Sequence, residues 1–304
     1  MPTNLALPGL CQQDAPVAER TLGVIGGSGL YDLPGLERVE RKRVETPFGD
    51  PSDEFVVGHL GDTRLVFLPR HGRGHRLLPS ELPYRANLYG MKTLGADCVL
   101  AVSAVGSLRE EIVPGHVVVP DQFIDRTRGR QAESTFFGRG VVAHVQFADP
   151  FCPVLSRALV AAARAAGSTV HEGGTYVCME GPAFSTRSES HLYRSWGAQV
   201  IGMTNLQEAK LAREAELCFA TLALATDYDC WREGHEDVQI DDILRVIAAN
   251  VDGARKTVAM LAPSLPPRTG CPCPRALENA IITDRAAIPA QTKRDLAPIA
   301  GRYL

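Results

Sequence analysis

Apolar and polar positions follow two different periods along this chain, and they divide most of it into strands and helices in turn. Continuous apolar runs that end at glycine or charged residues are typical of strands buried on both faces of a sheet. Apolar positions that recur every three or four residues are typical of amphipathic helices. The predicted strands are 22–27, 54–69 (a hairpin that turns at Gly61-Asp62), 97–108, 115–125, 173–182, 198–203 and 218–229. The predicted helices are 80–96, 153–167, 186–197, 206–217 and 240–263.

The order of these elements predicts an α/β fold in a single domain, with a central mixed β-sheet flanked by helices. This domain is expected to span residues 21–263. Residues 1–20 are interpreted as an N-terminal extension, and residues 264–304, which are rich in proline, as a C-terminal tail or peripheral segment. We find no internal repeat or long linker, so one folded unit is expected.

Composition excludes several classes of partner. The chain is 45% hydrophobic and 22% charged, with a formal net charge of −3, so it lacks the basic character of nucleic-acid-binding proteins. No uncharged apolar run approaches the roughly 18 residues that a membrane span needs. The N-terminus lacks the basic segment and apolar core of a secretory signal. We therefore expect a cytoplasmic protein without a nucleic-acid or membrane partner.

Cysteine spacing predicts no metal site. Most of the eight cysteines lie in apolar surroundings and are interpreted as small buried hydrophobes. No C-x-x-C pair occurs, which argues against a zinc ribbon. The pair Cys271-Pro-Cys273 lies in the Pro-rich segment, and its spacing is compatible with a small strained disulfide, a redox role or no role.

The glycine-rich turn after the first predicted strand is a candidate anion site. The stretch reads TLGVIGGSGLYD over residues 21–32. Its glycine spacing and the absence of a following helix do not fit a dinucleotide-binding fingerprint. A P-loop is also excluded, because no Gly-Lys-Ser/Thr follows. The remaining interpretations are a plain strand-ending turn, or a turn whose backbone N–H groups and Ser28 hydroxyl hold a phosphate.

Two further strand ends carry donors that suit a phosphate. Arg70 and His71 follow the predicted hairpin directly, and a guanidinium offers a planar fork of donors to phosphate oxygens. Ser103 and Ala104 add a hydroxyl and exposed backbone amides at another strand end. Ligands of open α/β sheets bind at such ends. A surface basic patch is the alternative interpretation around Arg70.

Two stretches carry groups that suit a flat heterocycle. Phe184 and Ser185 could stack on a ring and hydrogen-bond to it. Asp227 and Asp229 stand at alternate positions after a buried strand, so their side chains are expected to point the same way. The pair could receive the amino group of a heterocycle and protonate a ring nitrogen, bind a metal, or cap a helix. No histidine or third acid lies nearby in sequence to complete a metal site.

These motifs occur together in a recognisable order. They include GVIGGSGLYDLPGLE, RHGRGHRLLPSELPYRAN, EGPAFSTRSES and GMTNLQEAKLAREAELCFATLALATDYDCW. The set resembles the 5′-methylthioadenosine phosphorylases, the trimeric branch of the purine nucleoside phosphorylase superfamily, over about residues 21–262. The resemblance implies that residues 21–263 form a nucleoside phosphorylase catalytic domain. It also implies that inorganic phosphate attacks the anomeric carbon of the nucleoside, that adenine leaves, and that no cofactor is needed.

The resemblance also implies a role for each matching residue. The expected phosphate site is Ser28, Arg70, His71, Ser103, the Ala104 amide and Thr204. Met203 is expected to lie against the ribose, with Phe184 and Ser185 lining the base pocket. Asp227 and Asp229 are expected to face N7 and the 6-amino group of adenine, with Asp227 as the acid. The expected 5′-pocket is His144 of a neighbouring subunit, Ile240 and Ile243.

Alternatives and departures qualify this resemblance. A phosphorylase for 6-oxopurines or methylthioinosine would suit an asparagine where Asp227 stands, and a non-catalytic nucleoside-binding protein would not need the acid pair. Ala183 replaces the arginine that the family commonly has after EGP, which affects how that loop is anchored. The Cys-Pro-Cys segment resembles tails of some archaeal and thermophilic members that have disulfides and form hexamers. A trimer is the expected assembly here, with a hexamer as the alternative.

Overall fold

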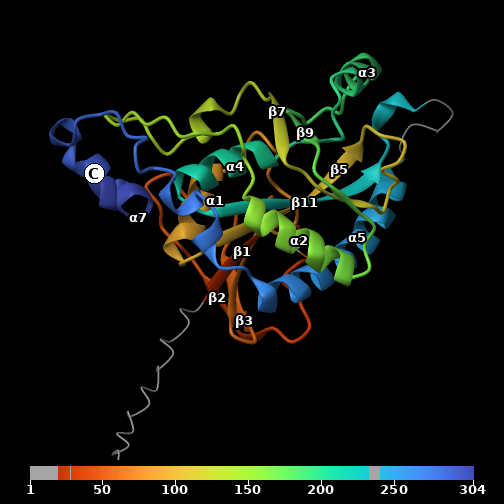
Figure 1. Ribbon diagram of the computed structural model, residues 1–304, viewed down its shortest axis with the longest axis horizontal. Helices are drawn as coiled ribbons and strands as arrows, with labels where there is room; N and C mark the ends of the chain where they lie inside the picture. The colour runs from red at the N-terminus through yellow and green to blue at the C-terminus, as the bar shows by residue number, and fades with distance from the viewer. Residues whose placement is uncertain (1–19, 28, 233–239) are drawn as a thin grey trace, which may run out of the picture.

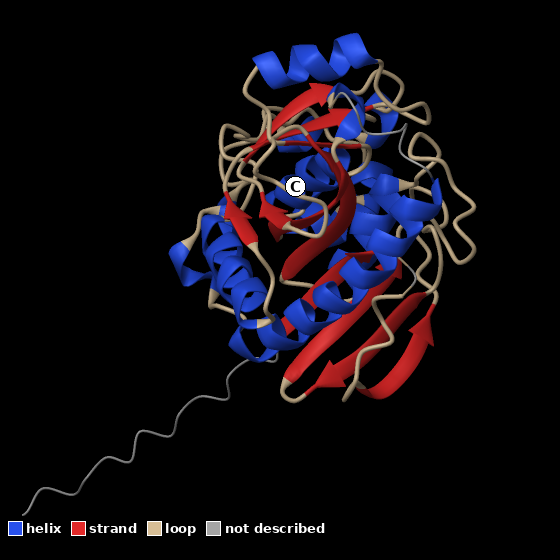
Figure 2. Cartoon of the chain, turned by 90° about the vertical axis from the view of Figure 1, so that its right-hand side faces the viewer, coloured by secondary structure: helices blue, strands red, loops and turns tan. Residues whose placement is uncertain are grey.

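The computed structural model describes residues 20–27, 29–232 and 240–304, and within them the strands form one mixed sheet (Figures 1 and 2). Its main path runs β2-β3-β4-β1-β5-β10-β9-β7, while β11 pairs with β5 and β6, and β6 also pairs with β8. The strands are β1 (Arg20–Gly26), β2 (Glu37–Lys42), β3 (Phe55–Leu60), β4 (Thr63–Pro69), β5 (Cys98–Ser107), β6 (Val117–Val119), β7 (Gln122–Arg126), β8 (Val170–Glu172), β9 (Thr175–Met179), β10 (Val200–Gly202) and β11 (Cys218–Asp227).

Helices cover both faces of this sheet. The helices are α1 (Tyr84–Thr93), α2 (Pro153–Ala165), α3 (Arg187–Ser195), α4 (Asn205–Glu214), α5 (Ile240–Leu261), α6 (Ala290–Asp295) and α7 (Ala297–Ala300). Figure 1 shows α1 and α4 on one side of β11, with α2 and α5 on the other. No helix in the described part of the chain is both long and apolar enough to span a membrane.

Alternating side chains of the central strands fill two cores. In β5, Leu100 and Val102 pack on the side of α2 and α5, while Val99 and Ala101 pack on the side of α1 and α4. Because both faces are covered, these strands are apolar at most positions and do not alternate between apolar and polar residues. The predicted α/β architecture with a central mixed sheet is therefore confirmed.

Most predicted elements are present, and the hairpin forms as β3 and β4, which pair antiparallel around the predicted turn. The single strand predicted over 115–125 is wrong, because it divides into β6 and β7 on either side of Pro120. Proline has no N–H for a ladder, and the chain changes partners there: β6 pairs with β11 and β8, whereas β7 pairs with β9. Strand β2 was not predicted, because its sequence ERVERK is largely polar and exposed.

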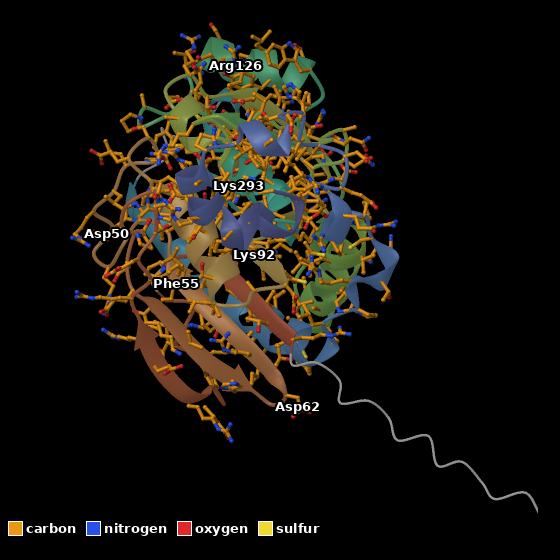
Figure 3. The ribbon with its side chains drawn as sticks, turned by 90° about the vertical axis from the view of Figure 1, so that its left-hand side faces the viewer. Asp50, Phe55, Asp62, Lys92, Arg126 and Lys293 are labelled. Carbon is orange, nitrogen blue, oxygen red and sulfur yellow. The ribbon has the colours of Figure 1, made fainter. Side chains whose placement is uncertain are left out.

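The Pro-rich segment after α5 is peripheral but packed. Its residues Leu277, Leu296 and Ile299 are buried in the same core as α1 and α4. The Tyr303 hydroxyl donates to Glu216 Oε1 at 2.7 Å. Figure 3 shows Lys293 of α6 and Lys92 of α1 on the same side of the molecule. Of the two interpretations offered for this segment, a peripheral element describes it and a free tail does not.

Candidate active site

The carboxyl ends of β1, β4, β5 and β11 meet at one edge of the sheet, because these neighbouring strands are parallel. Strand β10 runs antiparallel to β5 with Ile201 opposite Gly106, so the residues just after β10 approach the middle of β5. Gly106 is also opposite Asp227 of β11. The candidate residues from these strands therefore gather at one place in the fold, although they come from distant parts of the sequence.

The acid pair is held by its own backbone. Asp227 Oδ2 accepts from the Thr226 hydroxyl at 2.7 Å, and Asp227 Oδ1 accepts from the Asp229 N–H at 2.8 Å. Asp229 has a φ of +46° and starts a short 3₁₀ turn, so it has left the strand. The two carboxylates are thus brought together by this turn, and the expected pleat alternation is not the cause.

Burial sets the electrostatics of the pair. It raises the pKa of Asp227, against the opposing effect of the bonds from Thr226 and Asp229. It also raises the pKa of Asp229, to which the neighbouring Asp227 carboxylate contributes. Asp229 Oδ2 is buried and makes no hydrogen bond of regular geometry among the described residues, although the Ser190 and Ser185 hydroxyls oppose the rise in the pKa of Asp229. A buried acceptor without a donor is costly, so this oxygen is suited to an N–H of a ligand.

Arg70 lies in the interior and holds three segments together. Its Nε and Nη2 donate to the Glu208 carboxylate at 2.5 and 3.0 Å, and its Nη1 and Nη2 donate to the carbonyls of Val102 and Ile25. The guanidinium fork that suggested a phosphate contact is therefore engaged by Glu208. Of its five N–H groups, one on Nη1 has no partner within the described ranges and is available to a ligand.

His71 is held as a neutral imidazole. Burial lowers the pKa of His71 to about 4; the Leu77 carbonyl opposes this, while the charge of Arg70 reinforces it. His71 Nδ1 lies 2.7 Å from the Leu77 carbonyl oxygen, which can only accept, so Nδ1 carries the proton. The ring also stacks on His75 with centroids 4.3 Å apart. Its Nε2 is consequently left with a lone pair.

Three further positions offer donors near this edge. The Ser103 hydroxyl is buried and makes only long contacts, 3.3 Å to the Ala104 carbonyl and 3.5 Å to the Tyr176 hydroxyl. Ser103 and Ala104 lie inside β5, which continues to Ser107, so the strand end predicted at these two residues is wrong, although Ala104 is exposed. Thr204 is the N-cap residue of α4, and its side chain makes no capping bond. A helix N-terminus with an unused hydroxyl favours an anion.

Arg130 is a positioning residue that the sequence analysis missed. It is buried and donates to the carbonyls of Met203 and Glu180, and to the Tyr84 hydroxyl at 2.9 Å. It also reaches Glu180 Oε1 at 3.2 Å. One guanidinium thus fixes the loops after β9 and β10 against each other. Arg130 lies in the polar stretch RTRGRQAES, which follows the strand predicted over 115–125, but nothing in that stretch distinguishes Arg130 from the neighbouring arginines.

The loop of Phe184 is anchored from its first residue. Glu180 Oε2 accepts from the N–H groups of Arg128 and Gly129, at 2.5 and 3.2 Å. This anchor does not require the arginine that Ala183 replaces. The Ser185 carbonyl accepts from the Cys230 thiol at 3.2 Å, which places Ser185 beside the acid pair, whereas the Phe184 ring is 72% exposed.

Comparison with known proteins decides the family. The Phosphorylase superfamily profile matches residues 21–262. The S-methyl-5'-thioadenosine phosphorylase of Geobacter sulfurreducens is 63% identical over 286 residues, which cover 94% of this chain and 100% of that one. The protein of the same name from Koribacter versatilis is 54% identical, covering 93% and 96%. The chain belongs to the S-methyl-5'-thioadenosine phosphorylase family of this superfamily.

Solved structures of the family agree with this fold. A methylthioadenosine phosphorylase from an antarctic soil metagenomic library superposes with a TM-score of 0.87 at 46% identity, covering 92% of this chain and 99% of that one. The methylthioadenosine phosphorylase of Schistosoma mansoni, solved in complex with adenine, gives a TM-score of 0.77 at 39% identity, covering 81% and 92%.

Of the remaining predicted residues, only His144 is described with its side chain. His144 is exposed and lines a separate cavity of about 570 Å³, whose walls include Phe151, Arg213 and Pro272. Ser28 lies outside the described residues. Ile240 and Ile243 begin α5, whose backbone is described, but their side chains lie outside the description. The roles assigned to these four residues stay predictions, as do those of the other predicted site residues.

Proposed function

We propose that the protein catalyses the phosphorolysis of S-methyl-5'-thioadenosine to adenine and 5-methylthio-α-D-ribose 1-phosphate, as a pentosyltransferase. The observation that carries the proposal is the half-buried Asp227–Asp229 pair, at the sheet edge where hydroxyl and amide donors also gather. The name shared by the Geobacter and Koribacter relatives supports the same substrate. Inorganic phosphate is the co-substrate, and no cofactor takes part.

Asp227 supplies the proton that the leaving group needs. Adenine leaves poorly as an anion, so N7 must be protonated or strongly hydrogen-bonded as the glycosidic bond breaks. Burial raises the pKa of Asp227, so this carboxyl keeps its proton at a higher pH than an ordinary aspartate does. Asp229 Oδ2, which lacks a donor, accepts from the 6-amino group. A 6-oxopurine presents a carbonyl oxygen at that position, and two acceptors facing each other disfavour its binding.

Phosphate binds among the strand ends and attacks the anomeric carbon. Ser103, the Ala104 amide and Thr204 donate to its oxygens, together with the remaining N–H of Arg70. The lone pair on His71 Nε2 accepts the O–H of hydrogen phosphate, because Nδ1 already carries the ring proton. The transition state has oxocarbenium character, and the bound anion stabilises that charge as well as attacking it.

The active enzyme is a homo-oligomer, with a trimer as the expected state and a hexamer as the alternative. His144 lies on a cavity that is lined by none of the strand-end residues, which fits its serving the site of a neighbouring subunit. There it meets the 5′-methylthio group, beside Ile240 and Ile243. Such an apolar pocket favours methylthio over hydroxyl by only ~1–3 kcal/mol, so adenosine is expected to be a slower substrate. The reaction serves purine and methionine salvage in the cytoplasm.

The test is adenine release from S-methyl-5'-thioadenosine with and without inorganic phosphate, with adenosine and inosine as parallel substrates. The proposal expects release that requires phosphate and no activity on inosine. Release without phosphate would identify a hydrolase and refute the phosphate site. A preference for inosine would leave the phosphate site standing and refute the role of the acid pair.

A further inference from the structure

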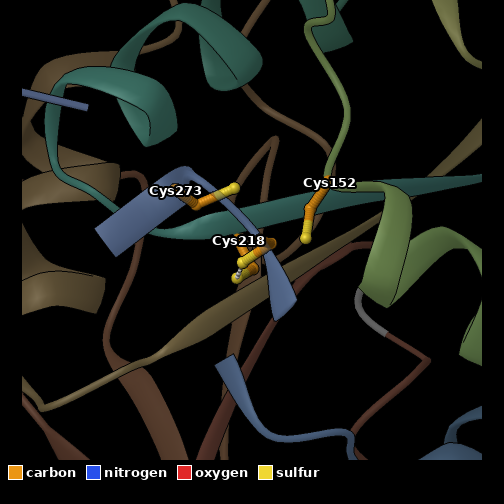
Figure 4. Close-up of side chains that lie close together, drawn as sticks. Cys152, Cys218 and Cys273 are labelled. Carbon is orange, nitrogen blue, oxygen red and sulfur yellow. Dashed lines mark hydrogen bonds between the residues drawn. The ribbon is translucent and has the colours of Figure 1, made fainter. Parts of the chain in front are cut away.

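Four cysteines from three distant segments meet beside the start of β11. Cys152 directly precedes α2, Cys218 is the first residue of β11, and Cys271 and Cys273 flank Pro272 in the C-terminal segment. Their sulfur atoms all lie within 4.8 Å of one another, and the sulfurs of Cys218 and Cys271 are 3.5 Å apart. Figure 4 shows the side chains of Cys152, Cys218 and Cys273 converging from three segments on one small space.

The spacing of these sulfurs differs from that of disulfides. A disulfide joins sulfurs at about 2.05 Å, and the structure records every cysteine of the described ranges as a free thiol. Four thiolates around a tetrahedral Zn²⁺ have Zn–S bonds of about 2.3 Å, which places the sulfurs about 3.8 Å from one another. The observed separations bracket this value. The four thiols are thus gathered to within a small adjustment of a metal-binding tetrahedron.

We propose that Cys152, Cys218, Cys271 and Cys273 form a tetrathiolate site for a single Zn²⁺ ion. Thiolates select soft cations, and zinc accepts tetrahedral geometry without preference among its ligands. Four protein ligands close the coordination sphere, which is typical of structural sites, so the ion takes no part in phosphorolysis. The proposed site contains no C-x-x-C pair, because two of its ligands form a C-x-C pair and the other two stand alone in the sequence.

Charge around the cluster favours bound thiolates. Zinc with four thiolates carries a net charge of −2, which needs compensation in a buried place. The guanidinium of Arg268 interacts with Cys218 and also pairs with Asp97 at 3.2 Å, and its Nε is buried without a hydrogen-bond partner among the described residues. Cys152 stands at the N-terminus of a helix of 13 residues, where the helix dipole stabilises a negative charge.

The site would fasten the C-terminal segment to the sheet. Cys218 and Cys271 are 53 positions apart, so coordination closes a long loop and restricts the unfolded chain. It would also fix the turn around Pro272 and Arg275, which lines the cavity of His144. Metal binding is therefore expected to stabilise the whole chain and to order this cavity wall in particular.

The test is metal analysis of the full-length protein, purified under reducing conditions without chelator. The expected result is one zinc per chain by inductively coupled plasma mass spectrometry, with a denatured mass that corresponds to fully reduced cysteines. After zinc removal, Co²⁺ should bind with the thiolate charge-transfer and ligand-field bands of tetrahedral coordination. A chain that binds no zinc on addition of Zn²⁺ under reducing conditions would overturn the proposal, as would a mass four hydrogens lower, which indicates two disulfides.

Two variants assign the ligands. Cys271→Ser removes the one ligand that is only partly buried, so its packing cost is small, and it should weaken zinc binding at least about tenfold and alter the cobalt spectrum. Cys178→Ala is the matched control, because Cys178 is a buried thiol in β9 outside the cluster. It should keep one zinc per chain. Equal zinc content in the two variants would refute the assignment, and the wild-type measurement decides the proposal even where a variant folds poorly.

Discussion

Replacing Asp227 by asparagine removes the proposed proton donor and keeps most of its contacts. The new Oδ1 can still accept from the Asp229 N–H, as Asp227 Oδ1 does at 2.8 Å. The new amide would face the Thr226 hydroxyl, which can accept from it and turn its own proton to the Val105 carbonyl, already 3.2 Å away. The variant should therefore fold normally, and thermal unfolding within a few degrees of the wild type is the first control.

The expected loss is in the chemical step. General acid catalysis contributes about 10²–10⁴ in rate, which at 1.36 kcal/mol per tenfold is roughly 3–5 kcal/mol of transition-state stabilisation. The pH profile should change as well. Because burial raises the pKa of Asp227, the wild-type rate should be high while this carboxyl is protonated and fall as the pH rises through its pKa. The asparagine variant has no proton to lose, so this limb should disappear.

The assay is steady-state phosphorolysis of S-methyl-5'-thioadenosine across pH, beside a ribosyl substrate whose leaving group departs without protonation. The variant should lose kcat on the adenine nucleoside and little on the activated substrate. Asp229→Asn is the matched comparison, because Asp229 is assigned to bind the 6-amino group and its loss should act more on KM. An unchanged kcat in the Asp227 variant, or equal losses on both substrates, would refute the assignment of the acid.

Three further predictions follow from the same geometry. Arg130→Met should lower the free energy of unfolding by ~2–4 kcal/mol, because buried carbonyls lose their donor, and should lower kcat/KM by about 10²-fold. Lysine lacks the forked guanidinium, so full activity in Arg130→Lys would contradict the assignment of Arg130 to holding the two loops together. Burial raises the pKa of Glu214 to about 7, so its contribution to stability is complete below about pH 4.5 and is lost as the pH rises through 7. Glu214→Gln should therefore gain up to about 3 kcal/mol in free energy of unfolding relative to wild type as the pH rises from 5 to 8, measured by denaturant titration. A difference between variant and wild type that does not vary with pH would contradict this. Gly106→Ala places a methyl group 3.1 Å from Asp227 Oδ1 and should lower kcat/KM at a stability cost of roughly 1–3 kcal/mol, whereas the control Gly253→Ala, whose nearest contact is 3.9 Å away, should be neutral in activity.

The elements that could be predicted well from the sequence are those whose burial produces a local pattern of apolar residues. Strand β5 is buried on both faces and reads as one apolar run, and α2 repeats apolar residues on one face. Strand β2 forms at an edge through backbone pairing with β3, which leaves no apolar signature in its polar sequence. The division at Pro120 follows from which strands lie beside each half, a fact that the segment itself does not contain.

The candidate site could likewise be predicted only in part. Its strand-end residues could be named because parallel strands bring their carboxyl ends together. Long-range partners could not: Glu208, which occupies the fork of Arg70, lies 138 positions away from it. The cysteine cluster was missed for the same reason, because spacing rules apply to ligands that are neighbours in sequence, whereas Cys152 and Cys218 meet through long-range contacts: α2 packs beside β11, and the Cys152 N–H donates to the Phe219 carbonyl at 2.8 Å.

The pairing of Arg70 with Glu208 bears on how the proposed reaction is stabilised. An unpaired guanidinium beside the phosphate would offset part of the anion's charge, and so weaken its attraction to the developing oxocarbenium ion. With Glu208 holding two sides of the fork, the pair is close to neutral and orients a single N–H toward the site. His71 is neutral at physiological pH, and the buried acids hold their protons more tightly than usual. Arg70, Glu208 and His71 together thus contribute little net charge, so the proposed phosphate remains the dominant charge on this side of the anomeric carbon.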